Sequence, residues 1–190
     1  MAIYCPSMTS GRLHQGENIS GLVQMKMNVS SLAASEGQVA DFVIHPYAII
    51  ASQDCDLEQD FELHQSGHAP ALGQQLPSIL FCEVGEADKV RVGPPNLKSD
   101  IWRRVKTNKD ERYQFLQKVD PDQDSDGVGI PALSVDFKRY FTIPNGEVYF
   151  RIKAEAKRRC VLQGPYLEHF MCRFFHFQLR VALPAEHDGD

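Results

Sequence analysis

A group of polar and reactive side chains surrounds one apolar run near residue 50 of this 190-residue chain. Residues 47–51 are continuously apolar, His45 precedes them, and Ser52, Asp54 and Asp56 follow directly. An imidazole, a hydroxyl and two carboxylates are groups that general acid–base and nucleophilic catalysis use. A strand end also holds such groups rigidly while their side chains reach solvent. We therefore predict a site formed by His45, Ser52, Asp54 and Asp56.

Simpler roles remain open for the same residues. Aspartates after a strand commonly bond their own backbone, so Asp54 and Asp56 could be turn residues. Cys55 is a poor nucleophile, because the neighbouring carboxylates disfavour its thiolate. Ser52 lacks the glycine pattern of a nucleophile elbow, so a catalytic triad with His45 is weakly supported.

Two patterns in the sequence suggest metals. Zinc-type ligands occur at four positions whose spacing matches no standard finger: Cys55, His64, His68 and Cys82. A second segment opens like a calcium loop, with Asp122, Asp124, Asp126 and Gly127, but its twelfth position is Leu133 rather than Glu. We predict no metal and no cofactor, and leave open whether the Cys and His set binds zinc.

Positive charge is concentrated in the second half of a chain whose formal net charge is −5. Two basic clusters stand out, one comprising Lys98, Arg103, Arg104, Lys106 and Lys109 around Trp102, the other Arg151, Lys153, Lys157, Arg158 and Arg159. Basic side chains attract phosphates, and a tryptophan can stack on a base. We predict that Trp102, Arg103 and Arg104 contact RNA, with ordinary solvated surface as the alternative.

The expected elements are mostly strands. Alternating or apolar runs predict strands at 22–29, 47–51, 78–84, 112–119 and 133–141. Hairpins are expected from 78–84 to 89–92 across Gly85, and from 133–141 to 148–152 across Pro144, Asn145 and Gly146. Helices are expected at 99–105 and, after Gly164 and Pro165, along an aromatic stripe near the C-terminus. Mobile loops are expected at 65–75 and 120–129.

Composition predicts one β-rich domain over residues 1–184, with a disordered tail at 185–190. The first 20 residues show no secretory signal, and no apolar run reaches membrane-spanning length. Five cysteines without close pairing fit a reducing compartment, so we expect a cytoplasmic protein that does not enter membranes.

The strand at 20–29 and the segment HPYAIIAS at 45–52 together resemble the first part of the PemK/MazF type of toxin. In that family an Arg-Pro precedes an apolar run that ends in Ser or Thr. Here Pro46 and Ser52 match, whereas His45 replaces the arginine. The resemblance covers about the first third of the chain. The motif SQDCDL is also similar to one in uncharacterised bacterial proteins.

The resemblance implies an SH3-like β-barrel, to which this chain adds a C-terminal helix, and a bacterial or phage toxin that binds or cleaves RNA. It also implies a homodimer and a neutralising antitoxin partner. In that case Ser52 contacts phosphate, His45 is the base, and Asp54 and Asp56 orient their neighbours. The alternative is a protein-interaction module of a toxin–antitoxin or defence system, which docks a basic partner through its acidic residues Asp54, Asp56, Glu58, Asp60 and Glu62.

Overall fold

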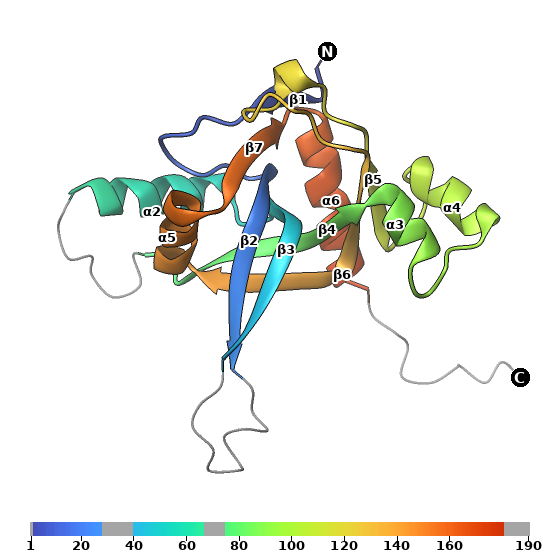
Figure 1. Cartoon of the computed structure of the whole chain (residues 1–190), viewed down its shortest axis with the longest axis horizontal. Helices are drawn as coiled ribbons and strands as arrows, with labels where there is room; N and C mark the ends of the chain where they lie inside the picture. The colour runs from blue at the N-terminus through green and yellow to red at the C-terminus, as the bar shows by residue number, and fades with distance from the viewer. Residues whose placement is uncertain (1, 28–39, 67–74, 181–190) are drawn as a thin grey trace, which may run out of the picture.

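The computed structural model describes residues 2–27, 40–66 and 75–180, and a seven-stranded antiparallel sheet runs through them (Figure 1). The strands follow the spatial order β1-β7-β2-β3-β4-β6-β5. Their bounds are β1 Tyr4–Pro6, β2 Glu17–Met27, β3 Ala40–Ile50, β4 Ser78–Glu86, β5 Tyr113–Leu116, β6 Leu133–Pro144 and β7 Lys157–Leu162. The predicted β-rich α+β class is confirmed. Within the described residues β1 and β5 are the two edges of this sheet, which is therefore open and not the closed barrel that we expected.

Five α-helices and one short 3-10 helix flank the sheet in the described ranges. They are α2 Asp54–Ser66, α3 Ala87–Val92, α4 Ser99–Lys106, η1 Pro121–Gln123, α5 Asn145–Ala154 and α6 Tyr166–Gln178. The predicted helices at 99–105 and at the C-terminus are confirmed as α4 and α6. The predicted tail and most of the loop at 65–75 lie outside the described residues.

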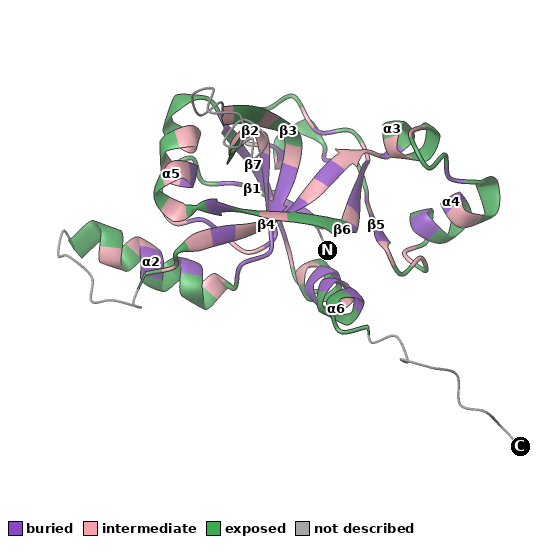
Figure 2. Cartoon of the chain, turned by 90° about the horizontal axis from the view of Figure 1, so that it is seen from below, coloured by how far each residue is buried: buried purple, intermediate pink, exposed green. Residues whose placement is uncertain are grey.

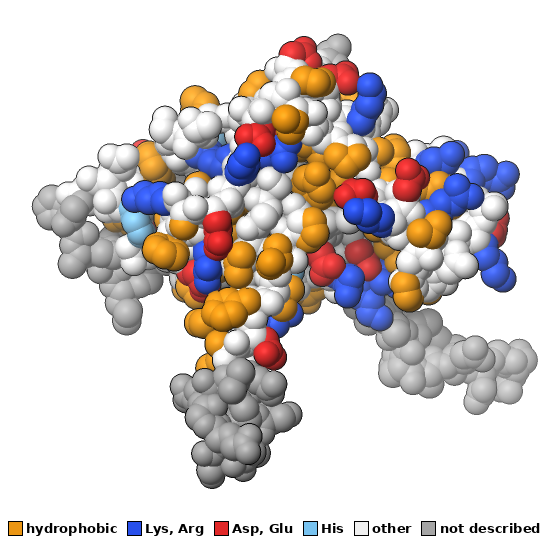
Figure 3. All heavy atoms as spheres, in the orientation of Figure 1, with side chains coloured by type: hydrophobic (Ala, Val, Ile, Leu, Met, Phe, Trp, Pro, Cys, Tyr) orange, Lys and Arg blue, Asp and Glu red, His pale blue; other side chains and the backbone are white. Residues whose placement is uncertain are grey.

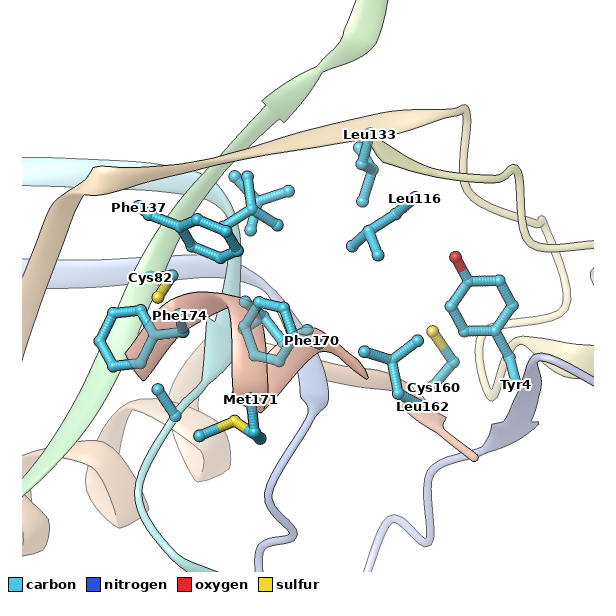
Figure 4. Close-up of a cluster of buried hydrophobic side chains, with 14 of the residues drawn as sticks. Tyr4, Cys82, Leu116, Leu133, Phe137, Cys160, Leu162, Phe170, Met171 and Phe174 are labelled. Carbon is cyan, nitrogen blue, oxygen red and sulfur yellow. The ribbon is translucent and has the colours of Figure 1, made fainter. Parts of the chain in front are cut away.

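Apolar side chains are buried on both faces of the sheet. On one face α6 packs its aromatic stripe against β4 and β6, and Phe170 and Phe174 surround Phe137 (Figure 4). On the other face Leu57 of α2 and Val148 of α5 join Ala48 and Ile50 in a second cluster. The alternation of β3 explains this division, because successive residues of a strand point to opposite faces. The continuous apolar run at 47–51 thus belongs to a strand that is covered on both sides (Figure 2).

The outer half of β2 and β3 projects from the body as a two-stranded ribbon (Figure 1). The two strands pair as far as Met27 and Ala40, but their outer neighbours β7 and β4 pair only with Glu17–Ser20 and Tyr47–Ile50. Gln24 binds the carbonyl of Thr142 from one face of the ribbon. The opposite face bears apolar side chains and is largely exposed.

Two predicted hairpins are wrong, because helices take the place of the return strands. Residues 89–92 belong to α3, and residues 148–152 belong to α5. Val148 and Ile152 stand four positions apart and both meet the second core cluster, which is the spacing of one helix face. The turn signal at Pro144, Asn145 and Gly146 therefore marks a helix start.

The predicted loop at 120–129 is tied to the sheet by a buried ion pair. The Arg159 guanidinium donates to both carboxylate oxygens of Asp124, at 2.8 and 2.6 Å. These bonds hold the pKa of Asp124 below its usual range. Lys157 binds the neighbouring Asp126. The aspartates that resemble calcium ligands in the sequence therefore pair with basic side chains, Asp124 with Arg159 and Asp126 with Lys157.

Candidate nucleic-acid interface

The imidazole of His45 is buried at the base of the ribbon. It stacks on Phe141, with ring centroids 3.8 Å apart and planes within 8°. Its Nε2 lies 3.3 Å from Oε1 of Gln24. Burial lowers the pKa of His45 from 6.5 to about 4, and the positive charges of Lys26 and Arg139 contribute. The ring is therefore neutral at pH 7 and engaged by an aromatic neighbour.

Ser52 lies just beyond the C-terminal end of β3, whereas His45 lies in the middle of that strand. Seven positions separate it from His45, which corresponds to roughly 20 Å along an extended chain. The Ser52 hydroxyl accepts a hydrogen bond of 2.8 Å from the backbone N–H of Leu80 in β4. The adjacent Ala51 N–H donates to the Leu80 carbonyl, also at 2.8 Å. Ser52 thus extends the pairing of β3 with β4, and it does not meet His45.

Asp54 and Asp56 belong to the first turn of α2. The Asp54 carboxylate accepts from the backbone N–H of Gln15 at 3.0 Å and pairs with Arg12 at 2.8 Å. It therefore ties the N-terminal loop to the start of the helix, where negative charge is favoured. Asp56 is exposed. The four predicted catalytic residues do not share one site in this structure.

The proposed zinc ligands are divided in the same way. Cys55 is exposed on α2, whereas Cys82 is buried in β4, where burial raises the pKa of its thiol. His68 lies outside the described residues. Across the described ranges, no three His, Cys, Asp or Glu side chains gather closely enough to hold a metal ion.

The first basic cluster forms a separate lobe at the β5 edge of the sheet. We call residues 87–109, which include α3 and α4, the basic lobe. Its small core contains Trp102, which is only 5% exposed and meets Phe115 of β5 edge-on, with centroids 6.3 Å apart. Trp102 therefore anchors α4 and does not offer the exposed stacking surface that we expected. Arg103 and Arg104 lie on the opposite, exposed side of the helix.

Charge in the basic lobe is strongly one-sided. Residues 87–109 contain seven Lys and Arg against two Asp, in a chain whose total charge is negative. Basic side chains gather over α4 at the right of Figure 3. Six of the seven form no ion pair with another described residue: Arg91, Lys98, Arg103, Arg104, Lys106 and Lys109. A surface with this much unpaired positive charge attracts polyanions.

The second basic cluster is largely neutralised. Arg158 is buried and donates to both carboxylate oxygens of Glu17, at 2.6 and 3.0 Å. Arg159 is held by Asp124 as described above, and Arg151 pairs with Glu147 of α5 and with Glu155, which follows the helix. These arginines stabilise the fold and add little to the surface potential.

A groove of about 460 Å³ lies between α3 and strands β4 and β6, at the start of β5. We call it the lobe groove. Two ion pairs line it, one joining Arg112 to both oxygens of Asp136 at 2.8 and 2.6 Å, the other joining Arg139 to Glu83 at 2.9 Å. The hydrogen bonds that Arg112 donates to Asp136 raise the pKa of the Arg112 guanidinium. Burial, followed by the charge of Asp136, raises the pKa of the neighbouring Tyr113.

The sequence did not point to the residues of the lobe groove. Arg112 and Asp136 stand 24 positions apart, and Arg139 and Glu83 stand 56 apart. Neither spacing forms a local motif, because the register of the sheet brings the partners together. The only signal in the sequence was the excess of basic residues in the adjoining segment.

None of the helices in the described ranges is long and apolar enough to cross a membrane. No protein-family model matches the chain, and neither a curated protein nor a solved structure is significantly similar to it.

Proposed function

We propose that this protein binds RNA through the basic lobe, with the phosphates lying along the exposed side of α4. One observation carries the proposal: six basic side chains of residues 87–109 are exposed and form no ion pair with a described residue. Lys and Arg that are free of carboxylate partners release counterions when they meet phosphates, which is the main source of affinity in such contacts.

The proposal is binding and not cleavage, because His45, Ser52, Asp54 and Asp56 are far apart or engaged by neighbours. A general base must lie within hydrogen-bond reach of the group it deprotonates. The resemblance to PemK/MazF toxins and an antitoxin partner remain predictions from the sequence. A cytoplasmic location belongs to the same proposal, and five free cysteines are consistent with it.

Fluorescence anisotropy with a labelled 12-nucleotide uridine RNA tests the proposal. We expect binding that weakens with added salt, with a log–log slope of about −2 to −4 if three to five phosphates are contacted. Combining Arg103→Glu with Arg104→Glu is expected to raise Kd at least tenfold and to reduce the slope. The RNA is expected to remain intact on a gel.

A matched control reverses the charge of two basic residues outside the basic lobe. Lys26 on the ribbon and Lys153 on α5 are also exposed. The double variant Lys26→Glu, Lys153→Glu is expected to change Kd less than about threefold. If the wild-type protein shows no salt-sensitive affinity, or if the control weakens binding as much as the α4 variant, the basic lobe is not an RNA-binding surface.

A second candidate function is protein interaction. The ribbon is a better candidate surface for it than the acidic residues that the sequence suggests. Of those acids, Asp60 is fully buried and Asp54 pairs with Arg12, so they form no continuous acidic face. One face of the ribbon instead exposes Met25, Phe42 and Ile44 by 51%, 61% and 67%. These lie on the cross-strand pairs Met25↔Phe42 and Val23↔Ile44, which share one face.

The occupant that suits this face is a second copy of the chain. A two-stranded ribbon is marginally stable alone and gains from packing its apolar face. The described part of the face carries no charged side chain, because Lys26 and Asp41 lie on the other side. A face without charges can match itself across a two-fold axis.

Sedimentation velocity over a range of concentrations tests whether the chain forms a dimer through the ribbon. We expect a concentration-dependent dimer that the double variant Phe42→Ser, Ile44→Ser abolishes. Val128→Ser removes a comparably exposed apolar side chain, 70% exposed, outside the ribbon and serves as the control. A wild-type protein that stays monomeric at all concentrations would rule the dimer out.

A further inference from the structure

The lobe groove adjoins the basic lobe, on which RNA phosphates are proposed to bind. Lys89 and Val90 of α3 line the groove, and α3 is part of the basic lobe. An RNA strand that extends from α4 over α3 would bring a base to this groove. This inference rests on the proposed RNA binding.

Every basic side chain that lines the lobe groove has a carboxylate partner, including Lys89, which pairs with Glu86, and this does not suit a phosphate. Arg112 is held bidentately by Asp136, and Arg139 is paired with Glu83. A phosphate is bound best by cations that lack a carboxylate partner. Neutral ligands that both donate and accept hydrogen bonds are a better match.

The second ion pair keeps unused hydrogen-bonding capacity that faces outward. Arg139 and Glu83 are 63% and 35% exposed in their side chains and share one hydrogen bond at 2.9 Å. A guanidinium has five N–H donors, and a carboxylate accepts at both oxygens. The pair can thus donate to one edge of a ligand and accept from another.

A buried hydroxyl without a partner is further evidence that the groove binds a ligand. Ser134 of β6 is only 1% exposed, lines the groove, and its Oγ has no hydrogen-bond partner among the described residues. Buried hydroxyls are nearly always hydrogen-bonded, and leaving one without a partner is unfavourable. A polar group in the groove would remove this cost.

Planar stacking is also available. The Arg112 guanidinium lies over the ring of Tyr113, 4.9 Å from its centroid, and its side chain is 36% exposed. Unpaired bases of RNA commonly stack on arginine planes. A volume of about 460 Å³ is in the range of small-ligand pockets and is sufficient for one base.

We propose that the lobe groove recognises a single unpaired guanine of the bound RNA. Guanine has two adjacent donors, N1–H and the N2 amino group, which suit a carboxylate such as that of Glu83. It also has two adjacent acceptors, O6 and N7, which suit the fork of a guanidinium such as that of Arg139. Adenine, cytosine and uracil lack this combination of paired donors and paired acceptors.

The test uses three RNAs of 12 nucleotides: uridine throughout, the same RNA with one central guanosine, and the same RNA with one central adenosine. Anisotropy is expected to give about tenfold tighter binding to the guanosine RNA than to the other two. Glu83→Gln and Ser134→Ala are each expected to remove this preference while changing the Kd for the uridine RNA less than about twofold. Circular dichroism and the unchanged uridine affinity show that each variant is folded.

Lys138→Gln is the control, because Lys138 is exposed on β6 between two groove residues without lining the groove. It is expected to retain the guanosine preference. If the uridine RNA binds in a salt-sensitive way but guanosine gives no advantage, or if Glu83→Gln retains the advantage, the guanine site is wrong and RNA binding stands. If none of the three RNAs binds, the proposed function fails and the guanine site fails with it.

Discussion

At the scale of single residues, the polar side chains that follow β3 complete the hydrogen bonding of the sheet and of α2. Ser52 supplies the acceptor for the Leu80 N–H, and Asp54 supplies one for the Gln15 N–H. Both donors would otherwise lack a partner close to the core, which is unfavourable for a backbone amide. The polar character of this segment therefore has a structural explanation.

Ser52→Ala is expected to destabilise the protein by about 1–3 kcal/mol, because the Leu80 N–H loses its buried acceptor. RNA affinity is expected to stay unchanged. Urea unfolding and anisotropy measure the two effects. Ser52→Thr keeps the hydroxyl and is expected to retain most of the stability. A stable Ser52→Ala protein with impaired RNA binding would return Ser52 to the functional site.

His45 is expected to make stability depend on pH in a defined range. Its folded pKa of about 4 lies below its ordinary value of 6.5, so the unfolded chain binds this proton first as the pH falls. The associated stability is complete above pH 6.5 and is lost progressively towards pH 4. The free energy of unfolding is expected to decrease by about 1–2 kcal/mol, a value that allows for partial hydration of the imidazole.

His45→Phe removes the titrating group and keeps an aromatic ring against Phe141. The decrease in the free energy of unfolding between pH 7.5 and pH 4.5 is expected to be smaller in this variant than in the wild-type protein, measured by urea denaturation. An equal decrease in both proteins would mean that His45 is not protonated preferentially in the unfolded chain.

Residue types in the sequence predicted polar atoms at a strand end, but not their partners. The partners of Ser52 and Asp54 are backbone amides 28 and 39 positions away, which only the register of the sheet and the path of the N-terminal loop bring close. The sequence places Arg158 and Arg159 in a surface basic cluster, because their acidic partners are equally remote, 141 and 35 positions away. Of the proposed binding surface, the sequence alone predicts only the basic cluster of residues 87–109, because its members lie close together in the chain.

At the scale of elements, Asn108 links the basic lobe to the sheet, in addition to the contact of Trp102 with Phe115. The Asn108 side chain donates to the Phe115 carbonyl at 3.2 Å and accepts from the Phe115 N–H at 2.7 Å. It thereby takes the place of a neighbouring strand at the exposed edge of β5. Asn108 also has a φ of 54°, a conformation that asparagine tolerates better than most residues.

Asn108→Ala is expected to destabilise the protein by about 2–3 kcal/mol, through two lost hydrogen bonds and an unfavourable backbone conformation. Asn108→Gly loses the bonds but accommodates the positive φ, so it is expected to cost about 1 kcal/mol less. Urea unfolding compares the two variants. If Asn108→Ala is as stable as the wild-type protein, the side chain does not hold the lobe to β5.

The sequence predicted elements well where one periodicity prevailed. The alternation in β2, the apolar run in β3 and the aromatic stripe of α6 each admit one interpretation. In α5, by contrast, Val148, Phe150 and Ile152 fit an alternating strand, while Val148 and Ile152 alone fit a helix face. The structure has the helix, in which Val148 is fully buried and Phe150 is 63% exposed, so the two do not share a buried face. Such information is absent from the sequence pattern.

At the scale of the whole molecule, charge and apolar surface are segregated. The basic lobe extends from one edge of the sheet, the apolar ribbon projects from its middle, and α2 and α5 lie towards the far side (Figure 1). RNA binding at the lobe and self-association at the ribbon could therefore occur together. The two activities are expected to respond independently to substitutions in α4 and in the ribbon.

Hydrogen exchange of the full chain, with and without the 12-nucleotide uridine RNA, tests the location of the site most directly. We predict that RNA slows exchange in residues 87–116, which include α3, α4 and β5, and leaves α2 unchanged. Protection confined to α2 and the residues that follow β3, with no change in the basic lobe, would contradict the assignment.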